Sequence, residues 1–270
     1  MSKYKVCQRI LALILALSFV SFCLFGCNSE DNGAASNKKN KATSASKDAD
    51  TKKDPNAKTV ALTFDDGPHN VRTKEIADEL AKYGYTATFF VVGNRVDGKA
   101  YNGAAALKYT YEKGNEIAIH GYTHSVYYDD CEQDRYEREL SRTYDAIKEV
   151  IPKAKVKLMR PIGGEISDER VEECDYSVIL WSVDSEDWKY KGRGENDELA
   201  EENINIIVEN VMSKVKSGDI ILMHDIYENT YEATKIILKR LHDEGYDVVS
   251  VSELLGKRAK AGTMYSKAPA

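Results

Sequence analysis

The chain has 270 residues, of which 42% are hydrophobic, so it is long enough to bury the core of one large domain or two small ones. Its five cysteines are too few for a fold built on disulfide bonds. The formal net charge of −6 argues against a nucleic-acid partner, because binding to phosphates requires clustered Lys and Arg side chains.

The first 26 residues have the pattern of a targeting segment. Lys3, Lys5 and Arg9 precede an apolar run over 10–25, and a basic head before such a run is typical of secretion signals. The sequence Leu-Phe-Gly-Cys at 24–27 resembles a bacterial lipobox, in which Cys27 would carry the lipid and become the first mature residue. An uncleaved membrane-spanning helix is the alternative. Both interpretations place the rest of the chain outside the cytoplasm.

Residues 27–57 are predicted to be a disordered tether. Between Cys27 and Thr59 the sequence contains no Val, Ile, Leu or aromatic residue, so this stretch cannot bury enough apolar surface to offset its ordering entropy. The composition changes at once beyond it. We therefore expect one folded domain over 58–256, followed by a C-terminal tail over 257–270 whose basic start at 257–260 is solvated.

Within that domain, short apolar runs alternate with amphipathic segments. The runs typical of buried strands are 59–64, 86–92, 116–119, 156–159, 176–183, 219–223 and 247–251. The segments with helical spacing are 74–83, 104–113, 136–150, 204–216 and 231–244. This alternation predicts an α/β protein with a parallel sheet covered by helices. About seven such units in one stretch favour a barrel or a barrel-like curved sheet.

Two adjacent carboxylates, Asp65 and Asp66, follow the first predicted strand and precede a Gly67-Pro68 turn. In a parallel sheet, functional groups gather at the edge where the strands end. Carboxylates at the end of a buried strand are costly unless a positive group faces them, which makes these two candidates for a site. An Asp-rich turn with solvated acids is the alternative.

Three of the five histidines also follow predicted strands. His120 and His124 stand four residues apart after one strand, and His224 follows another. Two imidazoles at this spacing can bind one metal ion, and Asp66 would complete a set that leaves a position open for water, as in catalytic zinc sites. Non-haem iron uses the same ligand types, so the ligand set does not fix the metal. Two unrelated polar residues are the alternative interpretation of the histidine pair.

Five motifs occur in an order and at a spacing that resemble the polysaccharide deacetylases, the NodB-homology domain of family 4 carbohydrate esterases. They are Thr63–Pro68, His120–His124, Arg160-Pro161, Trp181–Trp188 and Leu222–His224. The resemblance covers roughly residues 58–255. It implies a distorted (β/α) barrel, in agreement with the alternation of strands and helices.

The resemblance also implies roles for single residues. Asp66, His120 and His124 would hold a divalent metal, usually zinc, with cobalt or manganese as substitutes. Asp65 would be the general base toward the attacking water, and His224 would be the general acid that protonates the departing amine. Amide hydrolysis needs both proton transfers near neutral pH, and these residue types can supply them.

Further positions would support the reacting groups, again by resemblance. Arg160 would lie against Asp65 and keep it ionised, whereas Asp187 would orient His224 and keep it protonated. The residues implied to line the substrate groove are Trp188 and Leu222.

Two positions depart from the family pattern. After Arg160-Pro161 the chain continues Ile162-Gly163-Gly164 where a tyrosine is usual. Gly163 can still donate its backbone N–H to the oxyanion, but the packing surface of the tyrosine ring is lost. Gly121 stands where the family prefers Ser or Thr, whose hydroxyl braces the loop. Neither change removes a reacting group. We therefore expect these changes to affect which substrate shapes the site accepts more than the activity itself.

The two cysteines of the predicted domain, Cys131 and Cys174, leave two alternatives open. A disulfide is possible outside the cell, and a pair of buried thiols is equally expected.

Together these features lead us to expect a lipid-anchored, extracytoplasmic, monomeric hydrolase that depends on a metal ion. Its expected substrate is N-acetylglucosamine in a cell-wall polysaccharide, above all peptidoglycan. Alternative substrates are chitin-like oligosaccharides, poly-N-acetylglucosamine and O-acetylated xylan. A non-catalytic wall-binding lipoprotein on the same fold is a further alternative, although binding alone does not require the intact set of reacting groups.

Overall fold

The computed structural model describes residues 58–98, 103–125, 127–128, 131–191 and 201–269. The predicted signal segment, the tether and Cys27 lie outside these residues. None of the helices in the described ranges combines the length and the apolarity needed to cross a membrane.

The described strands form one nine-stranded sheet in the order β6-β7-β1-β2-β3-β4-β5-β9, with β8 paired to β1 as well. Their bounds are β1 (Lys58–Asp65), β2 (Thr88–Val91), β3 (Glu116–Ile119), β4 (Leu158–Met159), β5 (Ser177–Ile179), β6 (Val183–Asp184), β7 (Ile220–His224), β8 (Tyr246–Val248) and β9 (Met264–Tyr265). Every ladder between these strands is parallel, which confirms the predicted sheet type. Within the described ranges no ladder joins β6 to β9, so the curled sheet is a distorted barrel rather than a closed one.

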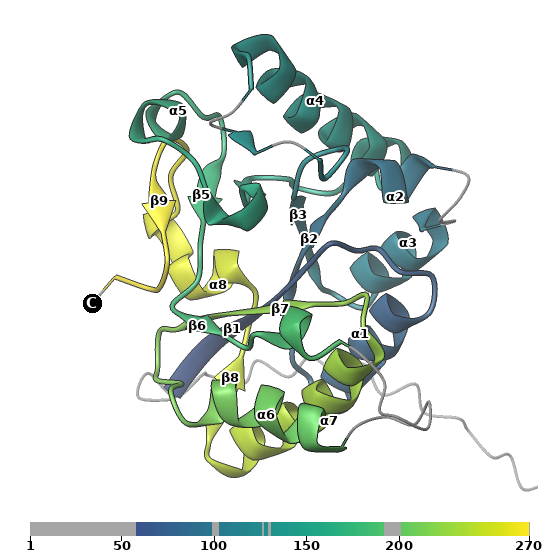
Figure 1. Cartoon of the computed structure of the whole chain (residues 1–270), viewed down its shortest axis with the longest axis vertical. Helices are drawn as coiled ribbons and strands as arrows, with labels where there is room; N and C mark the ends of the chain where they lie inside the picture. The colour runs from purple at the N-terminus through teal and green to yellow at the C-terminus, as the bar shows by residue number, and fades with distance from the viewer. Residues whose placement is uncertain (1–57, 99–102, 126, 129–130, 192–200, 270) are drawn as a thin grey trace, which may run out of the picture. The chain divides into compact units, whose positions relative to one another are not determined.

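Amphipathic helices cover the outer face of the sheet (Figure 1). The long ones are α1 (Arg72–Lys82), α3 (Ala104–Glu112), α4 (Gln133–Val150), α6 (Glu201–Met212) and α7 (Glu228–Asp243). The remaining helical segments are short: α2 (Gly93–Asp97), α5 (Asp168–Glu172), α8 (Val251–Leu255), which packs against the inner cluster of the sheet, and the 3₁₀ turns η2 (Ile162–Gly164), η3 (Asp187–Lys189) and η4 (Gly256–Arg258). In α1, for example, Ile76, Ala77 and Leu80 form the buried stripe that an amphipathic helix turns toward a core.

The two faces of β1 belong to two separate parts of the core. Leu62 and Phe64 pack in the large cluster between sheet and helices, whereas Ala61 packs in a smaller cluster with Phe90 of β2. Since successive side chains of a strand point to opposite faces, Asp65 shares the inner face with Ala61. The other members of the inner cluster are Ala118, Leu158, Ile179, Ile220, Val251, Leu255 and Tyr265. The inner cluster fills the barrel, and Asp65 lies beyond it at the carboxyl edge.

Two sequence predictions about the strands were wrong in detail. The run 176–183 is divided into β5 and β6, because β5 pairs with β4 whereas β6 pairs with β7 at the far end of the sheet. The predicted C-terminal tail, 257–270, contains Met264–Tyr265, which pairs with β5 as β9. Tyr265 is buried in the inner cluster, so this segment covers an edge of the sheet that would otherwise be unpaired.

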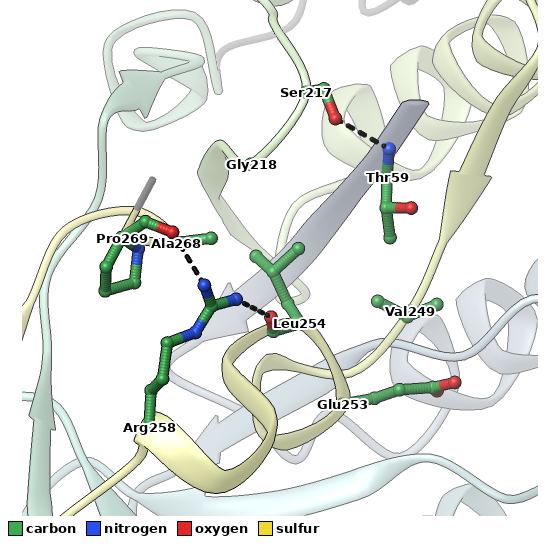
Figure 2. A pocket seen from close by; sticks show the side chains of 9 residues that line it. All are labelled: Thr59, Ser217, Gly218, Val249, Glu253, Leu254, Arg258, Ala268 and Pro269. Atoms are coloured by element: carbon green, nitrogen blue, oxygen red, sulfur yellow. Dashed lines mark hydrogen bonds between the residues drawn. The ribbon is translucent and has the colours of Figure 1, made fainter. Parts of the chain in front are cut away.

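A cavity of about 430 Å³ lies at the amino end of β1, the end opposite to Asp65 (Figure 2). Arg258 closes part of it by donating hydrogen bonds to the carbonyl oxygens of Pro269 at 2.8 Å and Leu254 at 3.4 Å. The other residues that line it are Thr59, Ser217, Gly218, Val249, Glu253 and Ala268. Its position separates it from the groups at the carboxyl edge.

Candidate active site

The three predicted metal ligands meet at the carboxyl edge of the sheet. Asp66 follows β1, and both His120 and His124 follow β3. Their ligand atoms all lie within 4.8 Å of one another. Asp66 Oδ1 is 2.8 Å from His124 Nε2 and 3.6 Å from His120 Nε2. A smaller cavity of about 180 Å³ opens beside them, and its lining includes Asp66, His124 and Arg95.

The backbone around these ligands has an uncommon conformation. Asp66 and His124 have φ angles of 72° and 54°, in the left-handed region that residues with a side chain rarely adopt. Such residues gather at functional sites, where the surrounding structure holds them in place. Gly67 is needed next to Asp66, because a Cβ there would collide with the carboxylate of Asp225.

The hydrogen bonds of His120 prepare it to bind a cation. The ring is buried, and its Nδ1–H donates to the carbonyl oxygen of Arg160 at 2.9 Å. Nε2, the nitrogen that faces Asp66, is therefore left as the acceptor. Burial lowers the pKa of His120, although Asp65 and Asp66 oppose that effect, and so favours the neutral imidazole that metals bind.

The other two ligands, Asp66 and His124, pair with each other in the metal-free protein, and a bound cation would replace the proton between them. Burial alone would raise the pKa of Asp66, but the contact with His124 and the charges of His120 and His124 hold it below its usual range. The hydrogen bond to Asp66 raises the pKa of His124. One anionic oxygen thus lies between two imidazole nitrogens, and this donor set fits a divalent cation.

Asp65 forms a buried ion pair with Arg160. Arg160 Nη1 donates to Asp65 Oδ1 at 2.7 Å, and both side chains are almost completely buried. The remaining guanidinium hydrogens donate to Thr63 Oγ1 at 2.8 Å and to the carbonyl oxygens of Ile179 at 3.0 Å and Leu180 at 3.1 Å. A buried charge is tolerated when it is paired and its hydrogen bonds are satisfied, as here. Arg160 therefore lies against Asp65, as the resemblance implied.

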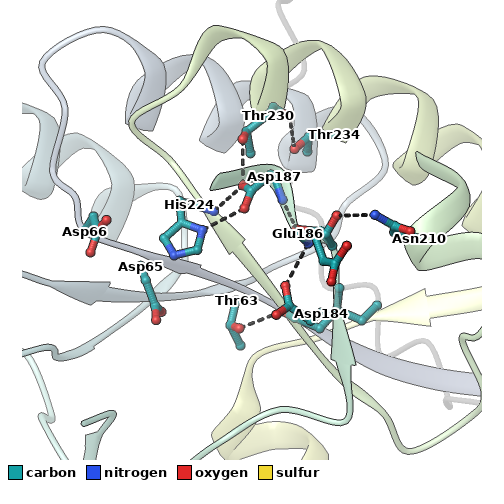
Figure 3. Close-up of polar contacts among 12 residues, drawn as sticks. Thr63, Asp65, Asp66, Asp184, Glu186, Asp187, Asn210, His224, Thr230 and Thr234 are labelled. Atoms are coloured by element: carbon teal, nitrogen blue, oxygen red, sulfur yellow. Dashed lines mark hydrogen bonds and ion pairs between the residues drawn. The ribbon is translucent and has the colours of Figure 1, made fainter. Parts of the chain in front are cut away.

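His224 and Asp187 form the second pair, shown in Figure 3 with the histidine ring between Asp187 and the adjacent Asp65 and Asp66. His224 Nδ1 lies 2.7 Å from Asp187 Oδ1, and Asp187 Oδ2 accepts from His224 N at 2.7 Å and from Thr230 Oγ1 at 2.6 Å. Burial alone would lower the pKa of His224, but the charge and hydrogen bond of Asp187 raise it to about 9. His224 is therefore protonated at neutral pH in the metal-free protein.

The predicted substrate-binding residues lie around these groups. Trp188 follows Asp187 in η3 and is 45% exposed, whereas Leu222 is buried in β7 two residues before His224. Gly163 lies in η2 with a φ angle of 66°, and a Cβ at this position would be 3.0 Å from the ring of Tyr127. Tyr127 is 48% exposed. The roles of Trp188, Leu222 and Gly163 toward a substrate stay predictions.

Cys131 and Cys174, for which a disulfide and two thiols were equally expected, are not joined by a disulfide bond in this structure. Cys174 is buried and Cys131 is half-buried. Arg170 donates to the carbonyl oxygen of Cys131 at 2.5 Å, which links α5 to the loop before α4.

Two buried acids near the site were not singled out from the sequence. Glu139 contacts the loop between the histidines, and Asp225 contacts Gly67 and accepts a hydrogen bond from Thr73. A signal for Glu139 was present, because it lies on the apolar stripe of α4 between Tyr136 and Leu140, where a charged side chain is unusual. Asp225 directly follows His224 at the end of β7, where strand-end reasoning also applies.

A curled parallel sheet that carries a His-His-Asp cation site, a buried Asp–Arg pair and a His–Asp pair at one edge is an arrangement typical of metal-dependent hydrolases. A profile of the family described as Polysaccharide deacetylase matches residues 52–178. The chain belongs to this family, since it is also at least 30% identical to members that it covers almost completely.

Three relatives illustrate the likeness. The peptidoglycan-N-acetylmuramic acid deacetylase PdaC of Bacillus subtilis (strain 168) is 38% identical over 201 residues, which are 74% of this chain and 39% of that protein. A peptidoglycan-N-acetylglucosamine deacetylase of Bacillus cereus is 34% identical over 212 residues, 74% of this chain and 89% of that protein. The structure of a family 4 acetyl xylan esterase from Clostridium thermocellum with a cobalt ion has a TM-score of 0.68 at 30% identity and covers 79% of this chain and all of that one. The chain thus spans less than half the length of PdaC.

Proposed function

We propose that this protein is a metal-dependent hydrolase that removes N-acetyl groups from N-acetylglucosamine residues of peptidoglycan. The observation that carries the proposal is the meeting of three metal-ligand side chains, a carboxylate paired with Arg160 and a histidine paired with Asp187 at one edge of the sheet. The names of the relatives support peptidoglycan as the substrate.

The proposed division of roles follows from the contacts of each group. Asp66, His120 and His124 would hold the cation. A divalent cation there supplies Lewis-acid chemistry, because it activates water and polarises the acetyl carbonyl. Asp65 is the base of the proposal: Arg160 occupies its Oδ1, whereas its Oδ2 lies on the side of the metal ligands, 3.6 Å from His120 Nε2.

His224 is the acid of the proposal. Its Nδ1–H is committed to Asp187, so the proton that it can transfer is the one on Nε2. A free amine leaves poorly unless it is protonated, and a positioned acid typically contributes about 10²–10⁴ in rate. Gly163 N–H would help to bind the oxyanion, and Trp188 and Leu222 would line the groove.

Zinc is the metal that we propose. Two imidazoles and one carboxylate are a common ligand set for a catalytic zinc ion. The same set accepts other divalent ions, and the acetyl xylan esterase of this family was crystallised with cobalt. Metal analysis of the protein purified from its native host would test zinc against cobalt and manganese.

We further propose that the mature protein is monomeric and that it is attached to the outer face of the cell membrane through a lipid on Cys27. The lipobox-like sequence at 24–27 supports the lipid attachment. In this proposal, a disordered tether over 27–57 carries the domain into the wall. The Cys27→Ala variant should leave the membrane fraction. Retention of that variant in washed membranes would favour an uncleaved span instead.

The decisive experiment measures acetate release by the full-length protein in detergent, with zinc and with a chelator, from peptidoglycan, chitin oligomers, poly-N-acetylglucosamine and acetylated xylan. Mass spectrometry of the digested peptidoglycan would locate the lost acetyl group on glucosamine or on muramic acid, the sugar named for PdaC. We expect zinc-dependent release from glucosamine. Tight wall binding without acetate release from any substrate, at full zinc occupancy, would instead identify a non-catalytic binding protein.

A further inference from the structure

The loop that joins the two histidine ligands, residues 121–123, is held on one side by the start of α2. Gly93 N–H donates to the carbonyl oxygen of Gly121 at 2.9 Å, and Asn94 N–H donates to that of Tyr122 at 3.0 Å. Gly93 fits against the loop so closely that a Cβ there would lie 2.5 Å from the Tyr122 ring. The carbonyl groups of the loop are therefore fixed by α2.

The N–H groups of the same loop are held from the opposite side by one carboxylate of α4. Glu139 Oε2 accepts hydrogen bonds from Tyr122 N and Thr123 N, both at 2.7 Å, and Glu139 Oε1 accepts one from Thr123 Oγ1 at 2.8 Å. Glu139 is only 5% exposed. Among the described residues, no Lys or Arg forms a salt bridge with Glu139. Its partners are instead the hydrogen-bond donors of the loop 121–123.

The residues that Glu139 holds lie directly before His124, a proposed metal ligand whose backbone conformation is unfavourable. Thr123 precedes His124, whose φ angle of 54° lies in the left-handed region. A residue with a side chain keeps that conformation only when its surroundings impose it. The N–H groups of the two peptide groups before Thr123 both donate to Glu139, whereas their carbonyl oxygens accept from α2.

The packing of the loop also accounts for Gly121. Its φ angle is 81°, and a Cβ at this position would lie 2.7 Å from the Tyr128 hydroxyl, whereas its distance of 3.5 Å from Glu139 Oε2 would be an ordinary contact. A larger residue would therefore collide with Tyr128. The loop thus has a glycine where both the backbone conformation and the neighbouring hydroxyl disfavour a side chain.

We propose that Glu139 is a positioning residue of the metal site, whose carboxylate holds the loop so that His124 already has its binding geometry before the cation arrives. The proposal rests on the proposed binding of a cation by Asp66, His120 and His124. Loss of a residue that orients metal ligands typically weakens metal affinity about 10- to 100-fold, and we expect a loss in this range for Glu139→Gln. The amide keeps the size of the side chain, but it lacks the negative charge that strengthens the bonds from the two loop N–H groups, and its NH₂ group cannot accept the bond from Thr123 Oγ1.

The test compares zinc affinities of metal-free, full-length variants in detergent, measured by competition with a chromophoric chelator. Glu139→Gln should bind zinc about 10- to 100-fold more weakly than the unchanged chain. Thr123→Val removes one of the donors to Glu139 and should have a smaller effect in the same direction. The control is Glu137→Gln, because Glu137 is an exposed acid of the same helix that accepts a hydrogen bond from Gln133, and the zinc affinity of this variant should not change.

The outcomes separate this proposal from the proposed function. If the unchanged chain binds no zinc, the metal site itself is refuted. If the unchanged chain binds zinc and folded Glu139→Gln binds it equally well, the positioning role is refuted, even if the variant unfolds at a lower temperature. If Glu139→Gln does not fold, Thr123→Val decides: weaker zinc binding supports the proposal, and unchanged binding overturns it. The absorption bands of bound Co²⁺ give a second readout, because a displaced His124 would change them.

Discussion

The Asp187→Asn substitution would change the proposed acid without changing its size. Asp187 Oδ2 faces two donors, His224 N and Thr230 Oγ1, and Oδ1 faces His224 Nδ1. An amide can satisfy both donors only with its oxygen, so its NH₂ group must turn toward His224 Nδ1. That nitrogen then has to accept a hydrogen bond. We therefore expect a neutral His224 ring with its hydrogen on Nε2.

The size of the effect follows from the pKa of His224. In the unchanged chain this pKa is about 9, against an ordinary value of 6.5, and Asp187 is the main group that raises it against the effect of burial. Asn at position 187 should lower it by about two pH units or more, which corresponds to about 3 kcal/mol for the protonated form. At pH 7.5 the protonated fraction would fall from nearly all molecules to about a quarter of them or less.

Nuclear magnetic resonance of the metal-free protein with ¹⁵N-labelled histidine measures both the pKa and the protonated nitrogen. The matched control is Thr230→Val, which removes one hydrogen bond from Asp187 but leaves its charge. We expect a much smaller change of the His224 pKa in this control. In the metal-loaded enzyme, the alkaline limb of kcat/KM should move to lower pH in Asp187→Asn alone.

Two results would refute this reasoning. One is a His224 pKa near 9 in a folded Asp187→Asn variant, because the charge of Asp187 would then not be what raises it. The other is an equal decrease in both variants, which would assign the effect to the lost hydrogen bonds and not to the charge.

Three further predictions concern other buried acids and Arg160. Asp65→Asn should retain zinc, but its kcat should fall by a factor of about 10²–10⁴. Asp66→Asn should bind zinc more weakly and should regain part of its activity in excess zinc. Zinc content and kcat, measured across a zinc titration, test both expectations. Arg160→Met should lower the free energy of unfolding by about 3–5 kcal/mol in denaturant titrations, because it leaves the buried Asp65 charge unpaired. Burial raises the pKa of Asp225 from 3.8 to about 7. The folded state therefore binds the proton of Asp225 more tightly than the unfolded state does. As a result, the contribution of Asp225 to the free energy of unfolding decreases as pH rises from about 4 to about 7. Asp225→Asn should therefore stabilise the metal-free protein more at pH 8 than at pH 5 in thermal unfolding, and an equal effect at both pH values would contradict this account.

Much of the site could be predicted because it depends on strand ends. In a parallel sheet all strands end at one edge, so Asp66, His120 and His224, which follow three different strands, had to come close together. The period of two along β1 also determines that Asp65 points into the barrel. These relations need only the element order, which the apolar runs of the sequence contain.

The features that the sequence did not predict depend on contacts between distant segments. The segment 264–265 is too short and too polar at its ends to be recognised as a strand, and it is one only because β5 offers it an edge. Glu139 was missed because nothing in the spacing of α4 says that its buried face meets the N–H groups of a loop. Similarly, the run 176–183 has the pattern of one strand. It is divided because its first part, β5, and its second part, β6, pair near opposite ends of the sheet.

Arg160 connects the two halves of the proposed chemistry through different atoms. Its side chain pairs with Asp65, and its carbonyl oxygen accepts the Nδ1–H of His120. The first contact positions the proposed base, and the second selects the nitrogen with which His120 can bind a cation. A methionine at position 160 would remove only the first contact, because the backbone carbonyl stays in place. Arg160→Met should therefore lose turnover while it still binds zinc, whereas any change that displaces the end of β4 should affect base and metal together.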